Sequence, residues 1–329
     1  MARRKGRPVD GVLLLHKPAG MTSNHALQRA KRLFFVEKAG HTGALDPLAT
    51  GVLPLCFGEA TKFSQFLLDA DKGYRTCIRL GVTTDTCDAD GEIIEQKSTA
   101  GITLAQVEAA LKPLRGDILQ VPPMYSALKL NGQPLYKMAR QGVEVERAPR
   151  PVTIHKMDIL AFRAGEAAEV ELDILCTKGT YIRSIAVDLG EALGCGAHVK
   201  TLHRSQAGLF TESQCVTLEE LEARFAAEQE AKGDDAGFAV LDSHLLSADA
   251  PVASLPAIEL PANSAYYFRL GNPVMVSKVY RFGEQGAIVR VFCAETEQSP
   301  RVFLGLGSIT GEGGVAPKRI LANRSANEV

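Results

Sequence analysis

The sequence predicts an α+β protein with two domains, of which the second is small and rich in β-strands. The chain has 329 residues, and a prior of about 150 residues per domain gives roughly two domains. In residues 9–250, the apolar residues of some segments are spaced as in a β-strand, and those of other segments are spaced as in a helix. From residue 251 to residue 325, short apolar runs are separated by glycine and proline, which is typical of a small β domain.

The composition is that of an ordinary globular protein. Hydrophobic residues make up 46% of the chain and charged residues 23%, which excludes a mainly disordered or collagen-like protein. The 37 Lys and Arg residues are balanced by 38 Asp and Glu residues, for a formal net charge of -1. A basic coat over the whole molecule is therefore excluded, whereas a local basic surface is not.

Cysteine usage and hydropathy predict a cytoplasmic protein. The seven cysteines are scattered and no two form a C-x-x-C pair, which argues against a disulfide framework and against a zinc site. No apolar run approaches the roughly 18 residues that a membrane span needs. The apolar stretch behind the basic start, residues 12–15, is too short for a secretory signal.

The first elements follow from local patterns. Residues 1–8 carry four basic residues without an apolar partner, so we expect a flexible basic tail. The apolar run at residues 11–15 predicts a buried strand, which a Lys-Pro pair ends. Thr22 is a typical N-cap for the helix that follows it. Two glycines and a proline predict a loop at residues 39–47.

Further along, residues 61–68 predict a short helix, and Thr103 begins a capped helix to Leu111 with Leu104 on its apolar face. Residues 74–80 alternate in polarity, which predicts a half-exposed strand with Tyr74 on its apolar face.

Residues 121–151 differ from their surroundings because they combine prolines, basic residues and two tyrosines. We expect a protruding, partly ordered insertion there. Strand patterns return at residues 151–162 and 170–175. A helix is predicted after Gly179 and Thr180, and an acidic, solvated helix and linker at residues 219–235.

Asp46 is the only carboxylate in the glycine-rich loop at residues 40–51. The following Pro47 biases its backbone toward extended conformations. An Asp in this setting usually caps a helix or forms an Asx turn, so spacing alone leaves a structural and a catalytic role open. His41, five residues earlier, suggests a metal pair only weakly because no third ligand is evident.

Arg183 lies with Tyr181 in the first turn of the predicted helix. A helix N-terminus with an arginine beside it suits an anion, and the arginine would keep a partner carboxylate ionised. An ordinary surface salt bridge fits the spacing equally well. The glycines between residues 305 and 314 lack the G-x-G-x-x-G spacing, and no Walker lysine pattern is present, so we exclude a nucleotide-binding motif.

Several longer motifs are specific in combination. They are GVLLLHKPAGMTS (residues 11–23), GHTGALDPLATGVLP (40–54), GEATKF (58–63), KGYR (72–75), LGVTTDTCD (80–88), VPPMYSALK (121–129), CTKGTYIR (176–183), GCGAHV (194–199) and the stretch from Gly305 to VAPKR at 315–319. Over nearly the whole chain they resemble the bacterial tRNA pseudouridine synthase B (TruB) family.

The resemblance implies isomerisation of the uridine at position 55 in the T-loop of tRNA to pseudouridine. It implies a pseudouridine synthase fold, in which helices flank a mixed, largely antiparallel sheet at residues 9–250, and a PUA-like RNA-binding domain at residues 251–325. The family's catalytic Asp falls on Asp46 and its pairing Arg on Arg183. The family's substrate-binding residues fall on His41, Tyr74, Tyr181 and the apolar Leu202. Of these, His41 is the residue that flips the target base and stacks, and Tyr74 is the residue that stacks on the target base. We also expect Tyr74 to assist loss of the C5 proton.

RNA recognition is expected to rest on shape and phosphates. We expect residues 121–151 to clamp the RNA, and a merely solvated loop is the alternative. The expected RNA contacts are Lys17, Lys62, Lys129 and Arg140. His16 stands where many members of the family carry Asp, and His203 stands in a segment that is often richer in Arg. Both depart from the family pattern and could alter a phosphate contact or local packing.

The expected partner is the T-arm of tRNA, with no cofactor, no metal, no obligatory protein partner and a monomeric chain. Two other hypotheses share these motifs. One is an RNA-binding or tRNA-folding module with a vestigial site. The other is the catalytic subunit of a guide-dependent H/ACA particle. The intact set of Asp46, Tyr74 and Arg183 favours catalysis, whereas the near-neutral charge and the insertion weigh against guide dependence.

Overall fold

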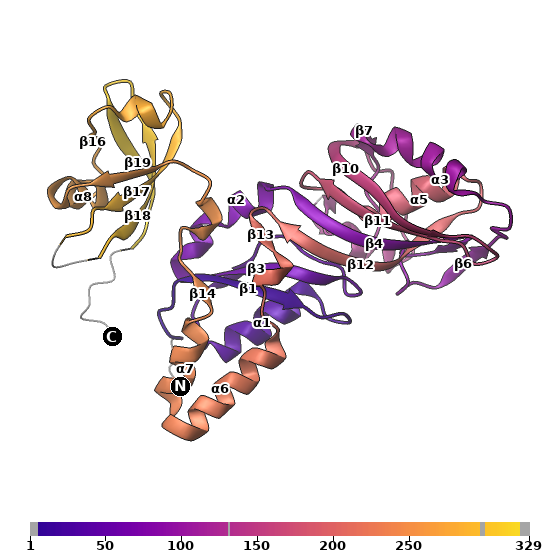
Figure 1. Ribbon diagram of the computed structural model, residues 1–329, viewed down its shortest axis with the longest axis horizontal. Helices are drawn as coiled ribbons and strands as arrows, with labels where there is room; N and C mark the ends of the chain where they lie inside the picture. The colour runs from indigo at the N-terminus through magenta and orange to yellow at the C-terminus, as the bar shows by residue number, and fades with distance from the viewer. Residues whose placement is uncertain (1–5, 131, 297–299, 323–329) are drawn as a thin grey trace.

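The computed structural model describes residues 6–130, 132–296 and 300–322. In this part of the chain, one large mixed sheet with flanking helices precedes a smaller five-stranded sheet (Figure 1). The predicted α+β class with a C-terminal β-rich domain is confirmed. The division at residue 250 and the end of the second domain at residue 325 remain predictions, and residues 323–325 lie outside the described residues.

The large sheet has ten strands in the described part of the chain. Its strands in the described chain are β1 (Gly11–Lys17), β2 (Ala39–His41), β3 (Thr50–Phe57), β4 (Lys72–Leu80), β7 (Gly116–Gln120), β10 (Arg150–Arg163), β11 (Glu169–Cys176), β12 (Ala197–Ala207), β13 (Phe210–Thr211) and β14 (Leu245–Leu246). Their spatial order is β14-β1-β3-β12-β4-β11-β10-β7, with β2 on β3 and β13 on β12. The β3–β12 pair is parallel and the other neighbours are antiparallel, as expected.

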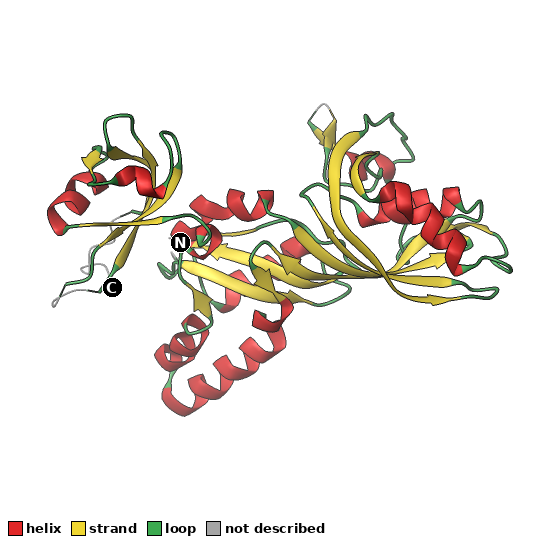
Figure 2. Ribbon diagram, turned by 45° about the horizontal axis from the view of Figure 1, so that its top comes forward, coloured by secondary structure: helices red, strands yellow, loops and turns green. Residues whose placement is uncertain are grey.

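Helices cover the two halves of this sheet separately. They are α1 (Ser23–Leu33), α2 (Ser64–Asp69), α3 (Leu104–Leu111), α4 (Leu135–Ala139), α5 (Ile182–Ala192), α6 (Leu218–Lys232) and α7 (Asp234–Asp242), with 3-10 turns η1 (Gly58–Phe63), η2 (Lys112–Leu114), η3 (Glu212–Gln214) and η4 (Ala250–Val252). One core joins α3 and α5 to β4, β10, β11 and β12. Another joins α1, α6 and α7 to β1 and β3. Seen from a second direction, the α6–α7 pair projects away from the sheet (Figure 2).

Two short hairpins lie outside the large sheet. They are β5 (Val82–Thr84) with β6 (Ile93–Gln96), and β8 (Lys129–Leu130) with β9 (Gln133–Pro134). The second hairpin and α4 fall within the insertion at residues 121–151, so part of this segment has regular structure.

Three local expectations differ from the structure. The loop expected at residues 39–47 begins with a short strand, β2, because residues 39–41 pair with β3. Leu104 was expected on the apolar face of α3, yet it is 51% exposed. Residues 1–5 of the expected flexible tail lie outside the described residues. Arg7 is held in place by an ion pair with Asp242, and its guanidinium lies 4.2 Å from the ring centre of Phe238.

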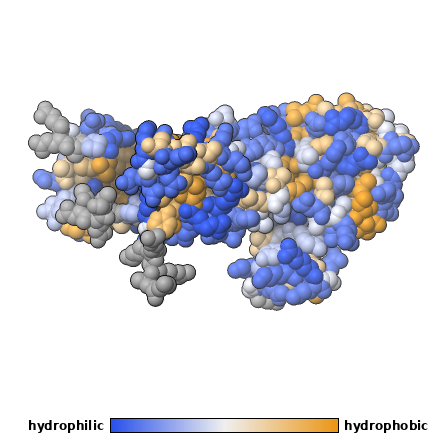
Figure 3. Space-filling model, turned by 90° about the horizontal axis from the view of Figure 1, so that it is seen from below, coloured by the Kyte–Doolittle hydropathy of each residue, from blue (hydrophilic) through white to orange (hydrophobic). Residues whose placement is uncertain are grey.

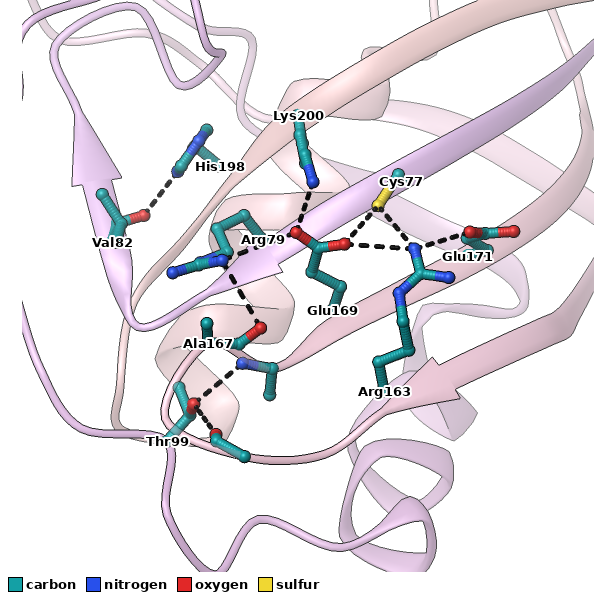
Figure 4. Close-up of polar contacts among 12 residues, drawn as sticks. Cys77, Arg79, Val82, Thr99, Arg163, Ala167, Glu169, Glu171, His198 and Lys200 are labelled. Atoms are coloured by element: carbon teal, nitrogen blue, oxygen red, sulfur yellow. Dashed lines mark hydrogen bonds and ion pairs between the residues drawn. The ribbon is translucent and has the colours of Figure 1, made fainter.

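The face of the sheet opposite the α5 core carries charged residues that pair across strands. Glu169 on β11 is a centre of these contacts, because its carboxylate lies 2.6 Å from Lys200 Nζ and 3.1 Å from Arg163 Nη2 (Figure 4). The hydrogen bond from Lys200 lowers the pKa of Glu169 to about 2. These pairs join β10, β11 and β12 on a solvated face.

The C-terminal β-rich domain contacts the rest of the chain directly. Its elements are β15 (Ala257–Leu260), α8 (Ala262–Arg269), β16 (Val274–Met275), η5 (Val279–Phe282), β17 (Ile288–Cys293), β18 (Val302–Ile309) and β19 (Gly314–Ile320). Phe63, Val252 and Leu306 form a shared apolar cluster across the junction. Lys62 Nζ donates to the carbonyl of Ile320 at 2.8 Å, and Arg290 pairs with Asp249 at 2.9 Å. Apolar and polar contacts therefore fix the orientation of the two parts.

The surface is mixed in character. Figure 3 shows a mainly hydrophilic face on which apolar residues form separate patches. None of the helices in the described ranges combines the length and apolar character that crossing a membrane requires.

Gly51 is required by the parallel pairing of β3 with β12. Its φ is +103°, and an added Cβ would lie 2.2 Å from the carbonyl oxygen of Arg204. We expect Gly51→Ala to lower the free energy of unfolding by about 3 kcal/mol or more, because backbone strain and a clash with backbone add. Gly101→Ala is the matched control, since Gly101 also has a positive φ of +90° but nothing within 4 Å of the added atom.

The Gly101 variant should lose only about 1–2 kcal/mol from backbone strain. Urea unfolding of the three proteins measures both changes. Equal losses in the two variants would show that the close approach of β3 to β12 is not the reason for Gly51.

Candidate active site

Asp46 lies in the loop between β2 and β3, and neighbouring segments hold this loop in place. The backbone amide of Leu45 donates to Ser23 Oγ at 2.7 Å. The carbonyl of Pro47 accepts from the amide of Gly20 at 2.9 Å, and the carbonyl of Asp46 accepts from Ala49 at 3.1 Å. The residues on both sides of Asp46 are therefore tied to the start of α1.

Lys17 is buried beneath this loop and is not on the RNA-facing surface. Its side chain is 0% exposed, and Nζ donates to the carbonyls of Pro18, Met21 and Pro47 at 2.8, 2.6 and 3.2 Å. These acceptors satisfy the three donors of an ammonium group. Burial lowers the pKa of Lys17 to about 8, and the charge of Asp46 opposes this change. The expected RNA contact at Lys17 does not fit this position, because a phosphate cannot reach the buried Nζ.

Asp46 and Arg183 form a bidentate ion pair. Arg183, in the first turn of α5, places Nε 2.9 Å from Asp46 Oδ2 and Nη2 3.0 Å from Oδ1. The Arg183 side chain is 5% exposed, whereas that of Asp46 is 33% exposed. A bidentate pair fixes the plane of the carboxylate, and the exposed part of Asp46 remains open to a substrate.

The same guanidinium has further partners that the sequence did not reveal. Arg183 Nη1 donates to the carbonyl of Thr86 at 3.1 Å and lies 3.8 Å from Asp88 Oδ2. Arg183 Nη2 also donates to the carbonyl of Tyr125 at 2.8 Å. Asp88 is a functional candidate that sequence reasoning missed, although it closes the LGVTTDTCD motif. Arg183 thus connects the catalytic loop, the β5–β6 region and the start of the insertion.

Burial raises the pKa of Asp46, while the charge of Arg183 opposes the rise and the charge of Asp88 adds to it. The expectation that Arg183 keeps this pKa low is therefore only partly met, because loss of hydration outweighs the ion pair. The guanidinium of Arg183 limits the rise in the pKa of Asp46 and fixes the orientation of its carboxylate.

Tyr74 and Leu202 belong to the apolar core beside α5, and Tyr181 lies at the start of that helix. Tyr74 on β4 packs against the α5 core, and Leu202 on β12 is 7% exposed within the same core. Tyr181 is the N-cap residue of α5, and its backbone amide donates to Gln120 Oε1 at 2.7 Å. Burial raises the pKa of both tyrosines, and the charge of Asp46 acts on both.

His41 ends β2 at the start of the same loop. Burial lowers the pKa of His41, and the positive charge of Arg204 lowers it further, which favours the neutral ring. Its buried Nδ1 has no hydrogen-bond partner in the described chain. No group of three His, Cys, Asp or Glu residues suited to a metal ion occurs among the described residues.

The remaining expected RNA contacts lie in two different places. Lys62 Nζ is engaged at the junction of the two domains, 2.6 Å from Glu59 and 2.8 Å from the Ile320 carbonyl, so it has a structural role there. Lys129 and Arg140 are exposed on the insertion. The guanidinium of Arg140 lies 5.6 Å from the ring centre of Tyr136.

The two histidines that depart from the family pattern affect local packing. His203 on β12 bonds through Nδ1 to Thr50 Oγ1 at 2.8 Å and pairs through Nε2 with Glu212. The ring centres of His16 and His203 are 5.6 Å apart. His203 therefore bonds to neighbours on β3 and η3.

The fold resembles chains in two solved structures of larger complexes. One is the structure of an H/ACA RNP bound to a substrate RNA containing 2'-deoxyuridine. It has a TM-score of 0.68 at 22% identity, covering 96% of this chain and 86% of that chain. A Cbf5-Nop10-Gar1 complex has a TM-score of 0.66 at 25% identity, covering 91% and 78%. These likenesses support the architecture described above.

Sequence comparison defines the class and then the family. Residues 31–182 match the model "TruB family pseudouridylate synthase (N terminal domain)". Residues 183–253 match "tRNA pseudouridylate synthase B C-terminal domain", and residues 256–321 match "Pseudouridine synthase II TruB, C-terminal". The chain is therefore a pseudouridine synthase, an isomerase.

Curated relatives narrow this class. The tRNA pseudouridine synthase B of Saccharophagus degradans is 56% identical over 97% of this chain and 98% of its own length. The protein of the same name from Escherichia coli K12 is 49% identical over 98% and 99%. The chain belongs to the TruB family.

The charges of Arg183 and Asp88 move the pKa of Asp46 in opposite directions. Removing one or the other should therefore shift the pH profile of activity in opposite directions. A catalytic role for Asp46 would require its ionised form, so activity would fall as the pH drops through the pKa of this carboxyl. Removing the guanidinium in Arg183→Gln should let this pKa rise further and move the acidic limb of single-turnover activity to higher pH. Asp88→Asn removes a negative charge and should move the limb to lower pH.

The measurement is the single-turnover rate of pseudouridine formation between about pH 4.5 and pH 8, a range that spans the usual carboxyl and imidazole pKa values. Shifts of both variants in the same direction would contradict the assignment of this limb to Asp46.

Proposed function

We propose that this protein isomerises uridine 55 in the T-loop of tRNA to pseudouridine, without a cofactor and as a monomer in the cytoplasm. The observation that carries the proposal is the bidentate pair of Asp46 with Arg183, at 2.9 and 3.0 Å, in which the Asp46 side chain is 33% exposed. The names of the curated relatives support tRNA as the substrate.

The reaction breaks the N1–C1′ bond of uridine, turns the uracil and joins C5 to C1′. It needs an ionised group to act as nucleophile or to stabilise the electron-poor carbon. Asp46 supplies this carboxylate, and Arg183 holds its oxygens in a fixed plane. Because C5 loses its proton while N1 gains one, the reaction changes no oxidation state.

The target uridine has to leave its stack before the carboxylate can reach it. In this proposal His41 occupies the space that the base vacates, and Tyr74 stacks on the uracil. Stacking tolerates rotation in the plane of the ring, which a fixed set of hydrogen bonds would prevent. Tyr181 and Leu202 complete the apolar wall, and Tyr74 also assists removal of the C5 proton.

Tritium release from tRNA labelled at uridine C5 tests the proposal, because the C5 hydrogen leaves only if the new carbon–carbon bond forms. The purified chain alone should release tritium, and Asp46→Asn should release none. Tyr74→Phe should bind tRNA normally but release tritium more slowly. The matched substrate control is the same tRNA with cytidine at position 55, which should give no release from that position.

The outcomes separate the competing hypotheses. Release that requires an added guide RNA would favour the H/ACA-type function. Absence of release by the parent chain, with tRNA binding intact, would favour an RNA-binding or tRNA-folding module.

We further propose that residues 121–151 hold the RNA as a clamp. The segment is anchored at its base, because the carbonyl of Tyr125 accepts from Arg183 and that of Val121 accepts from Ser184 Oγ at 2.8 Å. Lys129 and Arg140 are exposed farther along the segment. Cations on an anchored support suit phosphate contacts, which position an RNA without reading its sequence.

The salt dependence of RNA binding tests the clamp. Losing one phosphate contact should reduce the slope of log affinity against log salt by about one, so Lys129→Ala and Arg140→Ala should each show this change. Lys232→Ala is the matched control, since Lys232 on α6 is 67% exposed and pairs with Glu228. An unchanged slope in both insertion variants would show that the clamp does not contact phosphates there.

A further inference from the structure

Arg204 on β12 is a buried cation that none of the preceding steps uses. It is 1% exposed and is among the largest fully buried side chains of the described chain. Nε donates to the carbonyl of Val52 at 2.7 Å, and Nη2 donates to the carbonyl of Gly43 at 3.3 Å. Among the described residues no carboxylate forms an ion pair with it.

These two hydrogen bonds join three segments. Val52 belongs to β3, Gly43 belongs to the loop that carries Asp46, and Arg204 itself lies on β12. The backbones of β12 and β3 also meet here, because Arg204 is the register partner of Gly51. Arg204 therefore ties the loop between His41 and Asp46 to the parallel strand pair beneath it.

Arg204 also lies beside Tyr74 in the sheet. Arg204 and Tyr74 are register partners on neighbouring strands, and the charge of Arg204 opposes the rise that burial causes in the pKa of Tyr74. The titratable groups on which its charge acts include His41, Tyr74, Lys17, Lys72 and Cys215. Lys17 and Lys72 are themselves buried cations.

Burying a cation without a counter-ion costs several kcal/mol in typical proteins. The backbone carbonyls of Val52 and Gly43 accept hydrogen bonds from Arg204 but carry no full negative charge. Positive charge is therefore placed under the loop that carries Asp46 before a substrate enters. When the N1–C1′ bond breaks, its electron pair stays on N1 and the detached uracil becomes an anion. Preorganised positive charge stabilises such an anion without reorganisation during the reaction.

Resting on the proposed function, we propose that Arg204 is a positioning residue that ties the His41–Asp46 loop to the sheet and supplies the positive charge beneath the turning uracil. The C5 electron pair of this anion then forms the bond to C1′. The C5 proton leaves, its electron pair restores the C5–C6 double bond, and N1 takes up a proton, so atoms and charge balance.

The charge can be tested without RNA, through the titration of His41. Arg204 is the charged residue that acts on this ring, and its charge lowers the pKa of His41. Arg204→Gln removes the charge but keeps an amide donor, so the pKa of His41 should rise toward the ordinary value of about 6.5. Arg204→Lys keeps the charge and should leave the pKa of His41 near that of the parent chain.

NMR titration of the histidine ring protons measures these values, with His41 assigned through His41→Gln. Arg75→Gln is the matched control, because Arg75 is the neighbour of Tyr74 on β4 but is 57% exposed and pairs with Glu212. It should leave the titration of His41 unchanged. Thermal unfolding shows that each variant compared is folded, and the Lys variant gives a second test if the Gln variant is unstable.

The role in the reaction is tested by single-turnover tritium release with saturating enzyme. Arg204→Gln should slow release by about 10-fold or more, while the dissociation constant for tRNA stays within about threefold of that of the parent, since Arg204 is buried. Arg204→Lys should recover part of the lost rate. A merely structural role would lower thermal stability without moving the titration of His41.

Two results would overturn the proposal. One is an unchanged His41 titration in folded Arg204→Gln, and the other is a release rate equal to that of the parent in this variant. A parent chain that releases no tritium but shows the expected titration would refute the proposed function and leave the placement of the charge intact.

Discussion

The bidentate pair between Arg183 and Asp46 organises the site described here. Its guanidinium is almost fully buried and divides its donors between the catalytic loop, the carbonyl of Thr86 and the carbonyl of Tyr125. A planar cation with five donors can serve several acceptors at once, which a lysine cannot do in the same geometry. Because these acceptors come from separate segments, the position of the carboxylate depends on the correct folding of all of them.

Around this pair, buried cations outnumber buried carboxylates. Lys17 and Arg204 lie under the loop and donate to backbone carbonyls, whereas Asp46 and Asp88 are the acidic groups beside Arg183. Burial raises the pKa of Asp46 and lowers that of Lys17. In both residues, loss of hydration therefore disfavours the charged form. The loop thus combines a fixed backbone with a carboxylate whose ionisation depends on its neighbours, and such sites cluster where chemistry is performed.

Local patterns predicted much of the fold but only part of the site. The N-caps at Thr22 and Thr103 depend on nearby residues, and both are present. Asp46 and Arg183 were found through motifs, yet spacing alone left a structural role open, because their meeting depends on the tertiary fold. The burial of Lys17 was not predicted, because it depends on the loop around Pro47 folding over it, although Pro18 and Met21 also accept from its Nζ. For Arg204, the signal was available: an arginine two residues after Leu202 on an alternating strand points toward the apolar side.

The pairing of β1 with β14 has a consequence for synthesis of the chain. β1 ends at Lys17, but its outer neighbour contains Leu245 and Leu246. At typical rates of about 5–20 residues per second, translation needs roughly 10–50 s to reach that neighbour after β1 has been made. Residues 245 and 246 complete the outer edge of β1, which Val216 also bridges at Leu15. A strand edge that is incompletely paired favours association with other chains. The outer edge of β1 is therefore complete only when nearly three quarters of the chain has been made.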